Sequence, residues 1–403
     1  MKSRQTGFLF FAAFLVAARA TAQFKPPDTS QARFHVGPVL MNPVVDLTNV
    51  GVDSNVFFDP PGLEKRDFTL TLTPKTDLWM QLGRTWLTGA LREDMNWYRK
   101  YSSERSANSQ VGVGLIVPLT RVAFNVGATL INARERPGFE IDLRSRRHEA
   151  EFRVLGEVRT LAKTFIGFKA TRQTVEFDED AVFLGSNLRF ELNRTVTIGG
   201  VNLRHQLTPL TSLTVDVGRI QERFDFSPLR DSDSTSVGLQ VVFDPSALIK
   251  GSARFGFRSF QPLTAGLPDY QGPVLALDLS YALLGTTRFT AQATRDVAYS
   301  YQISQPYYLQ TGANFSVTQQ IYGPTDVVAR AGFQHMAYRN RQGFALPAAD
   351  RVDTVRMYGF GVGYHVGPDV RLGVNLDRQR RLSVISSHEY TATKFGASAT
   401  YGF

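Results

Sequence analysis

The sequence contains no cysteine among its 403 residues. This absence excludes disulfide bonds, a thiol nucleophile and cysteine-ligated metal centres. It also excludes the lipid anchor of bacterial lipoproteins, which is attached to a cysteine directly after the leader. Stability and function must therefore rest on backbone hydrogen bonding, packing and charge.

Long apolar runs are also missing after the N-terminal leader. No stretch there approaches the roughly 20 apolar residues that a membrane-spanning helix needs. Hydrophobic residues make up 43% of the chain, a proportion that a soluble protein could also have. A transmembrane barrel has the same polar average, because half of each strand faces a wet interior.

Charge of one sign is not concentrated in any part of the chain. The formal net charge is +9, of which Lys2, Arg4 and Arg19 in the leader contribute three, so the remainder carries +6. A modest excess of this size can bias a pore toward anions or attract anionic lipopolysaccharide. It differs from the concentrated basic face of nucleic-acid-binding proteins, so no nucleic-acid partner is expected.

Residues 1–22 have the layout of a secretory signal peptide. Lys2 and Arg4 precede an apolar core at residues 7–18, and Ala20 and Ala22 form a small-x-small cleavage site. An N-terminal membrane anchor is the alternative, but the apolar run is short for one. We therefore expect export, with residues 23–42 forming a periplasmic lead-in segment to a domain at residues 43–403.

The domain from residue 43 onward alternates between strand-like segments and turns. About 18 strands (16–20) are expected, and short turns rich in Gly, Pro and Thr alternate with longer, more charged connections. This asymmetry is typical of all-β, transmembrane, antiparallel up-and-down β-barrels, and an even strand number places both termini in the periplasm. Shifts in the apolar phase predict bulges near Asn49 and at Gly199-Gly200. Arg194, which falls on the apolar phase, is expected at the outer rim.

The last strand carries a possible insertion signal. From Phe395 the apolar residues alternate with small or polar ones, and the strand ends on Tyr401 and Phe403. This resembles, in part, the C-terminal signal that barrel-insertion machinery recognises. An ordinary sandwich strand is the alternative for this stretch alone. In a barrel, the last strand must pair with the first, near residues 44–52, so that no edge is left open in lipid.

Residue patterns for catalysis are absent from the sequence. The six histidines are scattered, without an HExxH motif, and no G-x-S-x-G occurs. His148 and His388 could meet acids in the predicted loops, but solvated histidines are the simpler interpretation. The acidic run at residues 53–67 could gather Ca²⁺, although a solvated loop is again simpler. We expect no enzymatic activity, no metal site and no cofactor.

The barrel interior is the candidate functional region. Extending the strand alternation inward predicts a mixed set of pore-lining charges, which would select ions by sign or merely keep the lumen wet. These residues are Arg92, Asp94, Arg153, Lys169, Arg254, Arg258, Arg288, Arg330, Arg371, Asp377 and Lys394.

Residues 33–60 carry a family resemblance. Gly37-Pro38, Pro43 and the G-x-D-S-N-V stretch at residues 51–56 resemble the start of the putative beta-barrel porin type 2 group of bacterial outer-membrane proteins. The resemblance implies an outer-membrane barrel of a Gram-negative-type bacterium. Some relatives are associated with exopolysaccharide export, so that resemblance also makes polysaccharide-export partners possible.

Two functions follow as predictions. The first is a porin-like channel for passive diffusion of small hydrophilic or charged solutes through a mixed-charge, slightly basic lumen. The second is a structural or accessory barrel of exopolysaccharide secretion with a plugged or partner-gated lumen. The partners expected in either case are outer-membrane lipid, lipopolysaccharide and the insertion machinery.

Overall fold

The computed structural model describes residues 26–245, 247–345, 348 and 350–402. The cleavage-site residues Ala20 and Ala22 and the terminal Phe403 lie outside the described residues. None of the described helices is long and apolar enough to cross a membrane. The first part of the chain holds β1 (Phe34–Val36), β2 (Val39–Asp53), β3 (Asp67–Leu82), β4 (Thr85–Tyr98), η1 (Ser102–Glu104), β5 (Ser106–Pro118), β6 (Val122–Glu135), β7 (Ser145–Leu161), β8 (Thr164–Phe177), β9 (Val182–Phe183), β10 (Ser186–Asn187) and α1 (Leu188–Leu192).

The remaining elements are strands joined by short connections or loops. They are β11 (Arg194–Thr208), β12 (Thr211–Phe224), η2 (Pro228–Arg230), β13 (Ser232–Phe243), β14 (Ile249–Pro262), β15 (Tyr270–Leu283), β16 (Thr287–Tyr299), β17 (Tyr307–Tyr322), β18 (Thr325–Arg339), β19 (Val352–Val366), β20 (Val370–Leu382), η3 (Ser386–His388) and β21 (Tyr390–Tyr401).

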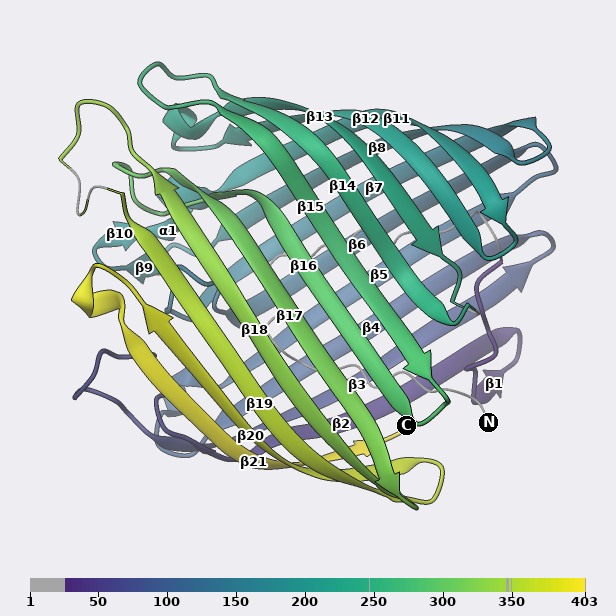
Figure 1. Cartoon of the computed structure of the whole chain (residues 1–403), viewed down its shortest axis with the longest axis horizontal. Coiled ribbons are helices and arrows are strands. Elements are labelled where there is room, and N and C mark those ends of the chain that lie inside the picture. Colours follow the sequence, from purple (N-terminus) through teal and green to yellow (C-terminus); the bar gives the residue numbers. More distant parts are fainter. Residues whose placement is uncertain (1–25, 246, 346–347, 349, 403) are drawn as a thin grey trace.

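Strands β2–β8 and β11–β21 form a closed antiparallel barrel (Figure 1). Each strand pairs with its sequence neighbour, and β8 pairs with β11 across the β9–β10 hairpin and α1. The ring closes between the two chain ends, where β2 pairs with β21 from Val45 opposite Tyr401 to Asp53 opposite Lys394. The described residues thus give 18 barrel strands, and the predicted pairing of first and last strands is confirmed.

The two ends of the barrel differ in their connections. One end, here the turn end, carries short links such as residues 323–324 and 367–369, while the other, the loop end, carries links such as residues 136–144 and 178–193. The first barrel strand starts and the last one ends at the turn end. The lead-in also lies there, since β1 pairs with β2 and Arg33 bonds Asp369 at 2.8 Å. The first barrel strand begins at Val39, four residues before the expected start at residue 43.

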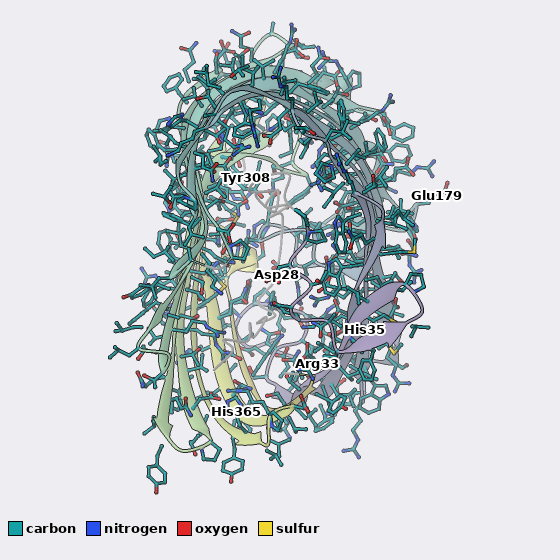
Figure 2. All side chains as sticks on the ribbon, turned by 90° about the vertical axis from the view of Figure 1, so that its right-hand side faces the viewer. Asp28, Arg33, His35, Glu179, Tyr308 and His365 are labelled. Carbon is teal, nitrogen blue, oxygen red and sulfur yellow. The ribbon has the colours of Figure 1, made fainter. Side chains whose placement is uncertain are left out.

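The two faces of each strand differ in polarity. On β14, Phe255 and Phe257 point outward and are 63% and 53% exposed, whereas Arg254 and Arg258 point inward and form ion pairs. Alternation of this kind places apolar side chains on the outer wall and polar ones in the interior. In the end-on view of Figure 2, Tyr308 of β17 points into the interior and Glu179 lies outside the wall.

One predicted bulge is confirmed and the other is wrong. The register of β2 shifts between Leu47 and Val50, where Asn49 has a φ of 54°. At Gly199-Gly200 the pairing of β11 with β12 is continuous. The backbone register of β11 therefore does not shift, although its apolar residues change from one face of the strand to the other. Arg194 and Val196 point inward instead, because at the loop end the barrel interior is filled and can bury apolar side chains.

Candidate functional site

The predicted pore-lining residues all lie on strand faces opposite the exposed apolar residues. On β8, for example, Lys169 alternates with Ile166 and Phe168, which are 53% and 45% exposed on the outer wall. The same alternation places the others inward: Arg92 and Asp94 on β4, Arg153 on β7, Arg254 and Arg258 on β14, Arg288 on β16, Arg330 on β18, Arg371 and Asp377 on β20, and Lys394 on β21. That they line a conducting path stays a prediction.

Most of these charges are paired with a carboxylate on the same or another strand. Arg254 holds Asp216 of β12 through two bonds of 3.0 and 2.7 Å, a bidentate geometry that fixes both side chains. Both side chains stay partly exposed, at 25% and 21%. Further pairs are Arg258–Asp296 (2.8 Å), Arg330–Asp377 (3.0 Å), Arg92–Asp94 (2.9 Å), Arg153–Glu151 (3.6 Å), Arg371–Asp326 (2.5 Å) and Lys394–Asp53 (3.4 Å).

Lys169 differs from this pattern. Its neighbours include Asp216 and Arg254, and Asp216 is already held by the Arg254 guanidinium. Among the described residues, Lys169 forms no ion pair within 4 Å. An inward cation whose charge is not neutralised contributes more to the field in the lumen than a paired one does.

The loop end of the barrel is crossed by a segment that the sequence predicts only as one of the longer, more charged connections. Residues 136–144, here called the lid segment, leave β6 and reach the opposite wall before returning to β7. There Arg381 of β20 donates to the Glu140 backbone oxygen at 3.0 Å and to Asp142 Oδ2 at 3.1 Å. Ser300, in the β16–β17 connection, donates to Glu140 Oε1 at 2.6 Å. The lid segment is therefore hydrogen-bonded to both of these elements.

A second anchor holds the two ends of the lid segment. Arg136 and Arg144 each donate to the backbone oxygen of Val56 in the β2–β3 connection, both at 2.8 Å. The guanidinium of Arg136 also lies 3.6 Å from the ring centroid of Phe58. Both arginines bind the same carbonyl oxygen, and the Phe58 ring lies against one of them. These contacts connect the lid segment to a third loop, the β2–β3 connection.

Apolar packing covers both sides of the lid segment. Ile141 is 4% exposed and belongs to a buried cluster with residues of β8, the 178–193 connection and Tyr301. Phe139 packs against a separate cluster on the inner faces of β17, β18 and β19. The members of the two clusters are Ile141, Val175, Phe177, Ala181, Leu188, Leu192 and Tyr301, and Tyr308, Met336, Tyr338, Val355 and Met357.

A buried charge network supports the lid segment from the β18–β20 wall. Asp353 accepts bonds from Arg351 at 2.7 Å and from Arg381 at 2.6 Å, and the side chains of all three are 0% exposed. His388 Nδ1 lies 2.9 Å from Arg351 and is also buried. Breaking a buried pair of this kind is costly, because the remaining charge is left without water.

Burial shifts the pKa values of the ionisable side chains in the lid segment. It raises the pKa of Glu140. It also raises the pKa of Asp142 to about 7, although the nearby charges of Arg381 and Arg136 act to lower it. The pKa of Arg136 is lowered to about 10, also chiefly by burial, so this guanidinium stays charged near neutrality. Asp142 is therefore a lid residue whose charge changes in the neutral range.

The tips of β16 and β17 also turn into the barrel. Pairing between β15 and β16 stops at Leu275 opposite Arg295, and the strands separate toward the loop end (Figure 1). Tyr299 then reaches the inner face of β12, where its hydroxyl donates to Glu222 Oε2 at 2.9 Å. Tyr307 packs on Phe260 of β14 with ring centroids 4.9 Å apart. This inserted hairpin narrows the mouth together with the lid segment.

The sequence carried a weak signal for the lid segment that was missed. Residues 134–147 carry many arginines and acids and therefore fit one of the longer, more charged connections that the sequence predicts. Phe139, Ile141 and Leu143 alternate with those charges, a pattern that a solvated loop does not need. The loop histidines were likewise expected in water. His388 is instead 5% exposed, and His148 lies 3.5 Å from Asp178.

Comparisons with known proteins identify one family and several similar solved structures. The profile of the family described as "Putative beta-barrel porin 2" matches residues 30–403. A BenF-like porin from Pseudomonas fluorescens Pf-5 shares 12% identity, with a TM-score of 0.49 over 91% of this chain and 98% of that chain. OpdK from Pseudomonas aeruginosa, solved with vanillate, shares 10% identity, with a TM-score of 0.47 over 90% and 97%. A bacterial polysaccharide outer-membrane secretin shares 9% identity, with a TM-score of 0.32 over 90% and 98%. No curated protein matches the chain.

Proposed function

Because the chain belongs to the Putative beta-barrel porin 2 family and is a porin-like channel of the Gram-negative-type outer membrane, we propose that small hydrophilic or charged solutes diffuse through it passively. The observation that carries the proposal is the polar interior, where charged residues from most of the barrel strands face one another. Members of porin families are typically channels rather than enzymes. The loop end faces the outside of the cell and the turn end the periplasm.

The lumen charges would act as a sieve for ions. Paired residues such as Arg254 and Asp216 create a transverse field without strong binding of a solute. Lys169, which has no ion pair among the described residues, adds a local positive potential. A slightly basic lumen of this kind favours small anions over cations of equal size. Passage would need no energy source, since nothing in the proposed path has to move against a gradient.

A second candidate function is favoured by the lid segment. The contacts of Glu140 and Asp142 with Arg381 and Ser300 would hold the outer mouth narrow until a partner displaces them. A barrel gated in this way would suit an accessory role in polysaccharide export, where a secretion partner opens the lumen. The two candidates share the same path and differ in whether the resting state conducts.

Planar-bilayer recording separates these candidates. The refolded mature protein is compared with a variant in which residues 137–143 are replaced by a Gly-Ser linker of equal length. A steady ion current from the unaltered protein, raised several-fold in the variant, is the result expected for a passive porin. A current from the variant alone would favour the gated barrel.

The control replaces residues 61–64, the exposed tip of the β2–β3 connection, and leaves Val56 and Phe58, which contact the lid segment, in place. It should conduct like the unaltered protein. If none of the three proteins conducted ions, although each showed the heat-modifiable gel band of a folded barrel, both candidates would be contradicted.

The exposed end of β21 bears on assembly. Tyr401 is 57% exposed on the outer face at the periplasmic end of that strand. An aromatic residue at this level suits the boundary between hydrocarbon and headgroups. We propose that Tyr401, with Phe403, is read by the insertion machinery before the strand pairs with β2.

A further inference from the structure

The outer wall of the barrel carries a groove over β16–β19. It has a volume of about 690 Å³, and its lining includes Arg295, His335, Arg356, Phe333 and Tyr358. These side chains share the outward face with the exposed Phe315, so the groove lies on the membrane side of the wall rather than in the lumen. It plays no part in the proposed passage of solutes.

The groove is polar at one end and apolar at the other. Along β17, Thr311 lies nearest the extracellular end, followed by Ala313 and then by Phe315 toward the membrane centre. Across the strands, Arg295 pairs with the Thr311 position and donates to its hydroxyl at 2.8 Å. A membrane lipid of the outer leaflet has the same polarity, with its headgroup outward and its acyl chains inward.

The polar end has positive charge, and the described strand positions around it provide no compensating acid. Arg356 is exposed, and no ion pair to it is present among the residues that the structure describes. The buried Arg295 Nε has no hydrogen-bond partner in that same part of the chain. Arg380 and Arg378 stand on the next strand, opposite Arg356 and Tyr358, and extend the basic surface. No Asp or Glu occupies an outward position on β15–β20. These outward positions are every second residue of each strand, counted from Leu275, Arg295, Thr311, His335, Thr354 and Leu382.

The arginines lie at a height along the strands where the headgroups of outer-leaflet lipids are expected. Arg295, Arg356 and Arg378 each lie four residues from the extracellular end of their strand. Strands of 13 to 16 residues in this part of the wall exceed the roughly 9–11 that cross the bilayer. The surplus places these arginines at the level of the outer headgroups, where a lipid-facing arginine costs little.

We propose that this groove binds a phosphorylated glycolipid of the outer leaflet. Its phosphate groups would contact Arg295 and Arg356, whose planar guanidinium groups match phosphate oxygens. One acyl chain would lie in the hollow left by the small side chains of Ala313 and Ala331, against Phe315 and Phe333. The bound lipid would cover the place where β15 and β16 separate.

The test measures lipid retention by native mass spectrometry of the refolded barrel in detergent. Diphosphoryl lipid A is the probe, and phosphatidylethanolamine is the comparison lipid. We expect one lipid A to be retained by the unaltered protein, and about tenfold weaker retention by the double variant Arg295→Gln/Arg356→Gln. Ala331→Trp, which fills the apolar end and keeps every charge, should also weaken it.

The matched control is Arg172→Gln/Arg219→Gln, which removes two outward arginines from β8 and β12, on another part of the wall. It should retain lipid A like the unaltered protein. Equal losses in the groove and control variants, or equal retention of phosphatidylethanolamine and lipid A, would overturn the proposal. Ion conductance of the groove variants should stay unchanged, so failure here would leave the proposed channel function untouched.

Discussion

The ion pairs at the outer mouth and those in the middle of the lumen have the same chemistry in different surroundings. Arg381 and Asp353 lie 2.6 Å apart with both side chains 0% exposed, and Arg254 and Asp216 lie 2.7 Å apart with 25% and 21% exposed. The mouth pair is sealed beneath the lid segment, whereas water can reach the lumen pair. The same contact is therefore buried at the mouth and accessible to solvent in the lumen.

This difference follows from what surrounds each pair. At the mouth, three loops and two apolar clusters exclude water, so each charge depends on its partner and on nearby donors. In the lumen, water screens both charges, and the energy of the pair is small. Substitutions in the mouth pair should therefore destabilise the fold, whereas charge substitutions in the lumen should leave the fold intact.

The largest effect should come from replacing one arginine at each place with methionine. Arg381→Met removes one of the two arginines that contact Asp353 and also removes two bonds to the lid segment, for an expected loss of about 3 kcal/mol. Arg254→Met should cost no more than about 1 kcal/mol. Urea unfolding in detergent measures the free energy, and limited proteolysis reports the release of residues 136–144. Equal losses from both variants would contradict the difference between mouth and lumen.

Much of this fold could be predicted from the sequence, because strand alternation and turn length are local patterns. The closure of β2 on β21 and the bulge at Asn49 followed from such patterns. The lid segment could not, because the contact of Glu140 with Arg381 joins residues 241 positions apart. The failed bulge at Gly199-Gly200 has the same origin, since inward Val196 is buried only because the mouth is filled. Local patterns do not say which interior positions are dry.

A smaller effect should come from lowering the pH, which protonates a carboxyl group of the lid segment at the mouth. In the docked lid segment the pKa of Asp142 is raised from 3.8 to about 7, so docking favours the protonated form. This contribution to docking is fully present below about pH 4 and is lost as the pH rises through about 7. Conductance should therefore be lower at pH 5 than at pH 8. Arg381, Arg136, Glu140 and Asp353 all act on this carboxyl.

The check is Asp142→Asn, which cannot ionise. Its conductance should vary less between pH 5 and pH 8 than that of the unaltered protein, with a remainder from Glu140, whose pKa burial also raises. Asp180→Asn, at an exposed loop position, is the control and should keep the full pH dependence. An unchanged pH profile in Asp142→Asn would rule out this carboxyl as the source.

The smallest effect should be on ion selectivity in the lumen. Lys169→Gln removes an inward cation that has no ion-pair partner among the described residues, so the reversal potential in a salt gradient should move toward that of cations. Arg172→Gln removes a charge three positions away on β8, on the outward face, and should leave the reversal potential unchanged. The two variants have the same net charge, and any difference between them reports which side of the wall each residue faces. If both variants shift selectivity equally, the field comes from the whole protein and Lys169 is not a lumen residue that acts on passing ions.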